Sequence, residues 1–161
     1  MNNSDANGLA VYGFKTDTSS PSITLNDNWW GSNDSPKGLV GGNNRYSPTI
    51  SRWAILTVSN ETPIVAGSTV KLTVSINNYT TGSSTGALSK PITVPCDLTV
   101  ETSFGDINGT LKNGEFSFDY LVPENLKYII VSVDSETQVL YVVPSRVSIQ
   151  IDEISGRKFD K

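Results

Sequence analysis

The residue types that most often carry out catalysis are sparse in this chain. Its 161 residues include no histidine and a single cysteine, Cys96. The sequence therefore excludes Ser-His-Asp and Cys-His catalysis, histidine-ligated zinc and an intrachain disulfide. We expect Cys96 to be a small buried apolar residue, because it alternates with Val94, Leu98 and Val100 along one face of a predicted strand.

Carboxylates are the remaining candidates for acid–base or metal chemistry. A glycosidase needs two of them across a sugar bond, and the candidates by residue type are Asp97, Glu101, Asp106 and Asp119. No motif supports this pairing, and we expect these side chains to be solvated outward positions of strands. Asp27 and Asp34 could bind calcium through loop oxygens, but their spacing matches no calcium-loop signature. We therefore expect no enzymatic activity, no cofactor and no metal.

A pair of tryptophans is the feature with the clearest functional alternatives. Trp29 and Trp30 are adjacent within a run of turn-forming residues from Asn26 to Pro36. Either this loop folds back and buries the indoles, which is the usual fate of aromatic area, or it presents them to a ligand. In the second case the rings would stack on sugars and polar side chains would bond the hydroxyls. The candidate binding residues are then Asn28, Trp29, Trp30, Asp34 and Trp53.

The composition favours an extracellular β protein. Only 37% of the residues are hydrophobic and 17% are charged, and Ser, Thr, Asn and Gly make up the balance. The net charge of −4 argues against nucleic acid and anionic membrane as partners, since both need basic patches. No apolar run approaches the roughly 18 residues of a membrane-spanning helix.

Sequons for N-glycosylation are frequent. Their acceptors are Asn2, Asn33, Asn60, Asn78 and Asn108. In a chain so rich in Asn, Ser and Thr several arise by chance, but the set fits a glycosylated surface protein.

The elements that would position these residues are short strands. Alternating apolar residues or apolar runs predict strands at 53–58, 68–79, 91–104, 115–120, 128–133 and 138–143. Asn113-Gly114 predicts a tight turn, and residues 134–137 predict the turn of a hairpin. The last two strands are apolar at both alternating positions, so we expect them to be central and covered on both faces. No helical periodicity lies between the strands, which favours an all-β, Ig-like antiparallel β-sandwich.

The Trp-rich run also carries a family resemblance. Asn28-Trp29-Trp30-Gly31, followed by Asn33 and Pro36, resembles the motif that closes the right-handed β-helix in large adhesin-like surface proteins of methanogenic archaea. In that family a strand opening on Trp follows, as Trp53 does here, and then Ig-like repeats similar to those of invasin-type adhesins. The resemblance implies a non-catalytic, extracellular, cell-surface adhesion module with a short β-solenoid remnant before the sandwich. Its implied partners are other cells, surface glycans or proteins, and the alternative is a carbohydrate-binding module.

The expected organisation has three parts. Residues 1–50 are the end of the β-helix, its cap and a linker, residues 51–143 are the Ig-like domain, and residues 144–161 are the start of a following repeat or an extra edge strand. The edge strands could also pair two copies of the chain. Residues 1–5 have neither the basic start nor the apolar core of a signal peptide. We interpret the chain as a fragment of a surface protein whose targeting signals lie outside it.

Overall fold

The computed structural model of the protein describes residues 11–13, 23–42 and 48–145. Over these residues the chain is all-β, with one 3₁₀ helix, η1, at Pro36–Leu39. The strands are β1 (Val11–Gly13), β2 (Val40–Gly42), β3 (Trp53–Asn60), β4 (Thr69–Thr80), β5 (Thr85–Ala87), β6 (Cys96–Glu101), β7 (Ile107–Leu111), β8 (Glu115–Leu121), β9 (Tyr128–Val133) and β10 (Glu136–Tyr141).

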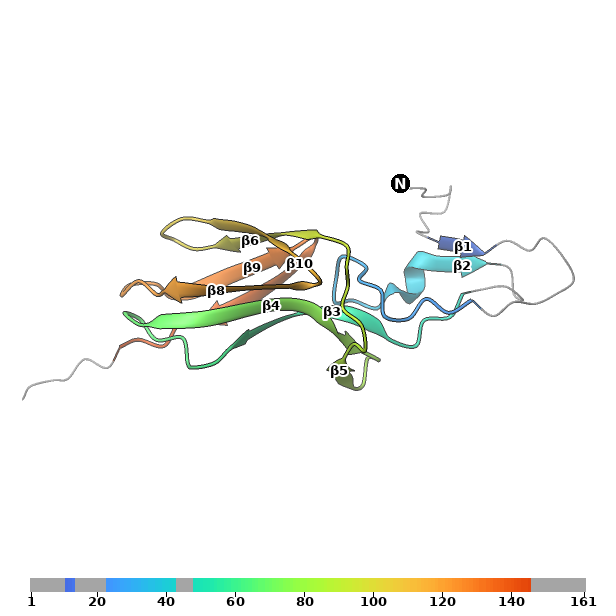
Figure 1. The fold of residues 1–161 in the computed structure, drawn as a ribbon, viewed down its shortest axis with the longest axis horizontal. Coiled ribbons are helices and arrows are strands. Elements are labelled where there is room, and N and C mark those ends of the chain that lie inside the picture. The colour runs from blue at the N-terminus through green and yellow to red at the C-terminus, as the bar shows by residue number, and fades with distance from the viewer. Residues whose placement is uncertain (1–10, 14–22, 43–47, 146–161) are drawn as a thin grey trace, which may run out of the picture.

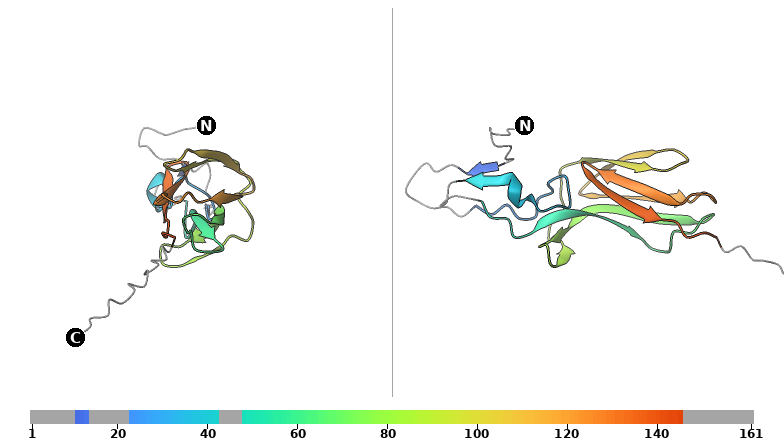
Figure 2. Two further views of the ribbon diagram at one scale, coloured as in Figure 1. Left: turned by 90° about the vertical axis from the view of Figure 1, so that its left-hand side faces the viewer. Right: turned by 180° about the vertical axis from the view of Figure 1, so that it is seen from behind.

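Two antiparallel sheets make up most of the molecule (Figure 1). In the first sheet β4 lies at the centre, with β3 along one side and β8 and β5 along the other. The second sheet has the order β10-β9-β6-β7. The sheets face each other, as the end-on view in Figure 2 shows, so the architecture is of the β-sandwich kind.

The core lies between these sheets and follows from strand alternation. The predicted inward set of β4, Val70, Leu72, Val74 and Ile76, is fully buried. Leu98, Val100, Ile129, Val131 and Val133 of the second sheet belong to the same buried cluster. Because the side-chain period of a strand is two, the intervening positions face outward. The predicted burial of Cys96 is also confirmed.

Tight turns connect several of the strands. Asn113 and Gly114 both have positive φ, 52° and 72°, and join β7 to β8 through the predicted two-residue turn. Asp134, with φ 52°, begins the turn between β9 and β10. This second turn becomes important below, because the Trp-rich run contacts it.

A parallel pairing distinguishes the N-terminal part. β1 pairs in parallel with β2, and Thr24 forms a parallel bridge with Thr49. These elements and residues 23–42 lie at one end of an elongated molecule, and the orange-red end of the described chain lies at the other (Figure 1). Most of the predicted solenoid remnant, and nearly all of segment 144–161, lie outside the described residues.

Several expectations need correction. The predicted strand at 91–104 begins only at Cys96, so Val94 does not share the buried face of β6 and is 67% exposed. The strand predicted at 138–143 is β10 and begins at Glu136. Two strands are absent from the predicted set: β5, which is short and rich in Gly and Thr, and β7, whose Asn108-Gly109 pair has the composition of a turn.

The prediction that the strands at 128–133 and 138–143 are covered on both faces is wrong. β9 lies inside its sheet, but β10 lies at the edge, and no described element covers the outer face of either strand. Tyr128, Val139 and Tyr141 are 48%, 47% and 78% exposed on that face. Tyrosine tolerates this position because its ring is apolar but its hydroxyl is hydrated.

Candidate functional site at the Trp-rich segment

The residues from Asn26 to Pro36, here called the Trp-rich segment, contact the turn between β9 and β10. The indole Nε1 of Trp29 donates a hydrogen bond of 2.6 Å to Oδ2 of Asp134. The carbonyl of Gly31 accepts from both the backbone N–H and the hydroxyl of Ser135, at 3.1 and 2.6 Å. The backbone N–H of Asn33 donates to the carboxylate of Glu136 at 2.9 Å. One polar turn thus anchors three successive parts of the segment.

The same segment is joined to the edge of β3 through Asn33. Its side-chain amide donates to the carbonyl of Leu56 and accepts from the N–H of Leu56, as a neighbouring strand would. The irregularity in the pairing of β3 with β4 falls at this place, between Ile55 and Thr57. The carbonyl of Asn33 accepts from the indole of Trp53 at 3.0 Å. Asn33 therefore uses its side chain and its backbone to fix the segment on β3.

An ion pair secures the start of the segment. Arg52 and Asp27 lie 2.6 Å apart, and the guanidinium of Arg52 stands 4.7 Å from the centre of the Tyr79 ring. The hydrogen bond to Asp27 is the main cause of a raised pKa of Arg52. Since Arg52 engages the carboxylate of Asp27, that carboxylate is not a free calcium ligand alongside Asp34.

The predicted binding residues differ in their availability. Trp53 is 4% exposed, so neither face of its ring is free to stack on a sugar, and its proposed role in binding is corrected to one in the core. Trp29 and Trp30 are half-buried, and Trp29 packs against the main core cluster. Asn28 and Asp34 are exposed. Among the described residues, Nε1 of Trp30 is buried and has no hydrogen-bond partner.

A hollow of about 310 Å³ lies against Trp29. Its lining consists of Asn28, Trp29, Pro91, Ile92, Thr93, Val94 and Cys96. The loop before β6 is positioned by Asn77, whose side-chain oxygen accepts from the N–H of Ile92 at 2.9 Å. An aromatic ring, an exposed valine and an amide at the rim can hold a small ligand with an apolar face and polar edges.

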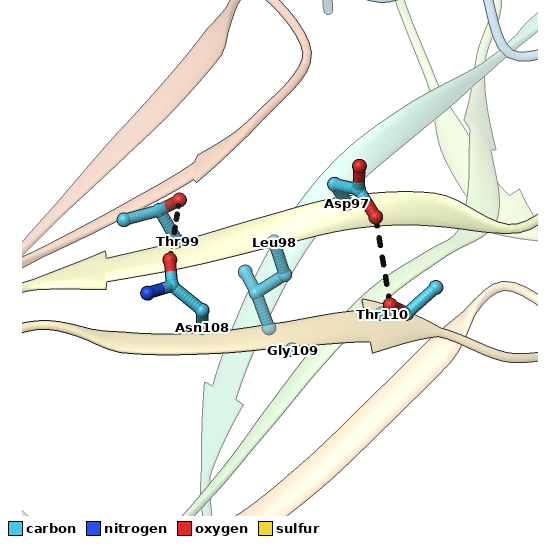
Figure 3. Close-up of a pocket in the computed structure, with 6 residues that line it drawn as sticks. All are labelled: Asp97, Leu98, Thr99, Asn108, Gly109 and Thr110. Carbon is cyan, nitrogen blue, oxygen red and sulfur yellow. Dashed lines mark hydrogen bonds between the residues drawn. The ribbon is translucent and has the colours of Figure 1, made fainter.

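The candidate carboxylates are distributed over different places. Asp97 accepts from Thr110 at 3.5 Å, in a cross-strand arrangement beside the Thr99–Asn108 pair at 3.2 Å (Figure 3). These four polar side chains line an open hollow of about 480 Å³ on the outer face of β6 and β7. Asp119 lies on β8, in the other sheet.

Glu101 and Asp106 are the two candidate carboxylates that share a site. Both line one smaller hollow, of about 220 Å³, together with Tyr128. In the part of the chain that the structure describes, no group of three or more Asp, Glu or Cys side chains could hold a metal ion.

The sequon acceptors also differ. Asn60 and Asn108 are exposed, although Nδ2 of Asn60 donates to the nearby carbonyl of Thr62 at 2.9 Å. Asn33 and Asn78 are half-buried, and their Nδ2 atoms donate to the carbonyl of Leu56 and, at 2.8 Å, to the hydroxyl of Thr57. Asn2 lies outside the described residues.

Burial raises the pKa of the Cys96 thiol, which suits a structural residue.

Sequence reasoning missed the partners that hold the Trp-rich segment. Asp134, Ser135 and Glu136 were interpreted only as a hairpin turn, although more than a hundred residues along the chain separate this turn from Trp29. Their polarity is ordinary for a turn, so nothing local indicated a contact with the tryptophans. The loop at Pro91–Val94, which lines the hollow beside Trp29, falls within the strand predicted at 91–104 and is therefore not indicated by the sequence either.

Comparisons with known proteins leave the site to be judged on its geometry. Neither family models nor curated proteins give a match to this chain. Within the described residues, no helix has the length and apolar character needed to cross a membrane.

Proposed function

We propose that the protein is a non-catalytic, extracellular module of a cell-surface adhesin, acting as a spacer that holds an adhesive region away from the cell. The observation that carries this proposal is the junction at the Trp-rich segment. Hydrogen bonds join Trp29, Gly31 and Asn33 to two separate parts of the sandwich, the β9–β10 turn and strand β3. A spacer needs such a fixed joint between consecutive parts, because a flexible joint would not transmit direction.

The strand connections support an Ig-like fold for the sandwich. β3, β4 and β8 belong to one sheet, while β6, β7, β9 and β10 belong to the other. The chain therefore passes between the sheets after β5, after β7 and after β8. This crossing pattern of seven main strands is typical of Ig-like sandwiches.

The N-terminal part supports the end of a β-helix. The parallel pairs Val11–Val40 and Thr24–Thr49 are of the kind that stacked turns of a solenoid form. The Trp-rich segment lies between these pairs and the sandwich, where a cap would lie (Figure 1). Together with the motif at residues 28–36, this arrangement supports the resemblance to adhesin-like surface proteins of methanogenic archaea.

A pair of variants tests the spacer function. Asp134→Ala removes the acceptor of the Trp29 indole and should lower the stability of the junction. Val94→Ala instead changes a residue that lines the hollow and makes no hydrogen bond at the junction. We expect neither variant to change binding of the labelled protein to whole cells or to a panel of polysaccharides. Saturable binding that falls in Val94→Ala, with the fold intact by circular dichroism, would contradict a purely structural role for this end.

The second candidate is a carbohydrate-binding module, favoured by the hollow of about 310 Å³ beside Trp29. It makes the opposite prediction for the same experiment. Val94→Ala and Trp29→Ala should then both weaken binding to the same polysaccharide. Asp134→Ala should weaken binding only if loss of the hydrogen bond to the Trp29 indole displaces that ring.

A further inference from the structure

Two tyrosines stand on the outer face of the second sheet, which the sequence predicted to be covered. Ile129 and Val131 are fully buried, so alternation along β9 places Tyr128 and Ile130 on the opposite face. Tyr141 lies directly across from Tyr128 on β10, and Val139 lies across from Ile130. Two tyrosines that are paired across adjacent strands therefore lie on one exposed face, and we call them the aromatic pair.

Tyr128 lines two hollows that contain different polar groups. One, of about 220 Å³, is lined by Glu101, Thr102, Ser103, Asp106, Tyr128 and Ile130. The other, of about 250 Å³, is lined by Ser103, Asn125, Leu126, Lys127 and Tyr128. The first hollow supplies carboxylate acceptors, and the second supplies amide and ammonium donors. A ring bound over Tyr128 would have both acceptors and donors within reach.

The size of the aromatic pair decides between a protein partner and a small ligand. From the exposed fractions of the two rings, and about 150–250 Å² for a whole aromatic side chain, the pair offers roughly 200–300 Å². A stable protein interface takes about 800 Å² from each partner. Even with Val139, which is exposed on the same face, the surface is too small for that, whereas the two rings match the flat face of one or two sugar rings.

We propose that Tyr128 and Tyr141 form a platform that binds uncharged sugar rings of a polysaccharide. The sugar's C–H face stacks on the tyrosines, Glu101 and Asp106 accept hydrogen bonds from its hydroxyls, and Asn125 donates to its oxygens. The two carboxylates outnumber the one ammonium group, that of Lys127, around Tyr128 and so disfavour polymers of uronic acids, because like charges repel. This site is separate from the hollow beside Trp29 and does not depend on the spacer function.

Affinity electrophoresis tests the proposal with defined polymers. The intact protein is run in native gels that contain soluble xylan, galactomannan, mixed-linkage β-glucan or, as the anionic comparison, alginate. At least one neutral polymer should retard the wild-type protein, and alginate should not. Tyr128→Ala should raise the apparent dissociation constant by about tenfold or more, while Tyr128→Phe, which keeps the ring, should retain most of the retardation.

Two controls make the outcome decisive. Leu121→Ala changes an exposed apolar residue on β8 of the other sheet and should migrate like the wild type. Leu39→Ala changes an exposed apolar residue of η1, far along the chain from the platform, and should also keep its retardation. The proposal is overturned if no neutral polymer retards the wild type, if Tyr128→Ala is retarded equally, or if alginate is the polymer that binds.

Discussion

Asn33 allows the junction to be tested by a single substitution. Its side chain pairs with both backbone groups of Leu56, a residue that is 1% exposed. Asn33→Ala removes both partners and leaves a carbonyl and an N–H unpaired at the edge of β3. Each such group costs about 1–3 kcal/mol when it is kept from water. Because β3 is an edge strand and water can partly replace the side chain, we expect a total loss of about 2–4 kcal/mol.

Urea denaturation followed by tryptophan fluorescence measures this loss. The indole of Trp53 is bonded to the carbonyl of Asn33, so its emission should report the junction directly. Asn33→Asp keeps the size of the side chain and an oxygen that accepts from the Leu56 N–H. It replaces the amide NH₂, which donates to the Leu56 carbonyl, with a second carboxylate oxygen. We expect it to be no more stable than Asn33→Ala, because a charge is then left beside an acceptor.

Asn108→Ala provides the matched control. Asn108 is an exposed asparagine whose side chain makes one hydrogen bond, from Thr99, and its loss should cost no more than about 1 kcal/mol. If Asn33→Ala and Asn108→Ala lower the free energy of unfolding equally, water has replaced the Asn33 side chain. The two hydrogen bonds between Asn33 and Leu56 would then make no special contribution to stability. A wild-type stability for Asn33→Asp would likewise refute the importance of the bond to the Leu56 carbonyl.

Three other predictions concern different parts of the molecule. Trp30→Ala removes a half-buried indole worth about 2–3 kcal/mol and should loosen the N-terminal part more than the sandwich, so a melt in which only the sandwich transition shifts would contradict it. Gly114→Ala should cost about 1–3 kcal/mol in chemical denaturation, because φ is 72° and the added Cβ would meet the side chain of Asn77. In protein made by a glycosylating host, peptide mass spectrometry should find glycans at the exposed Asn60 and Asn108, but not at Asn33, which is half-buried and joined to β3.

Gly105 gives the control for the turn glycine. Its φ of 123° is also positive, but a Cβ there would meet nothing within 4 Å. Gly105→Ala therefore measures backbone strain without a steric clash, at a φ farther from the left-handed helical region than that of Gly114. A loss of less than about 1 kcal/mol in Gly114→Ala would show that the side chain of Asn77 moves aside without cost.

The sandwich was predictable where one physical signal dominated. Alternation along β4 gave its buried face, and Asn113-Gly114 gave its turn, because both signals act within a few residues. β7 was missed because its Asn-Gly pair has the composition of a turn, and only its pairing with β6 makes it a strand.

The candidate site was less predictable because its contacts are distant in sequence. The alternation of β9 and β10 correctly indicated apolar residues on both faces, but could not indicate whether another element covers the outer face. Trp53 and Trp29 are the same residue type, so the sequence does not distinguish them. In the structure Trp53 is buried and bonded to Asn33, whereas Trp29 is bonded to the β9–β10 turn and borders a hollow.

The parallel bridge between Val65 and Val143 has a mechanical consequence. The N–H of Val143 donates to the carbonyl of Ile64, and its carbonyl accepts from the N–H of Ala66. Because the described chain leaves the sandwich at the end opposite the Trp-rich segment (Figure 1), tension along the long axis pulls these two stretches past each other. The bonds are then loaded in shear and share the force, whereas a hairpin pulled at its open end would unzip one bond at a time. Extension of single molecules should accordingly find Val143→Pro, which removes the donor, yielding at lower force than the wild type.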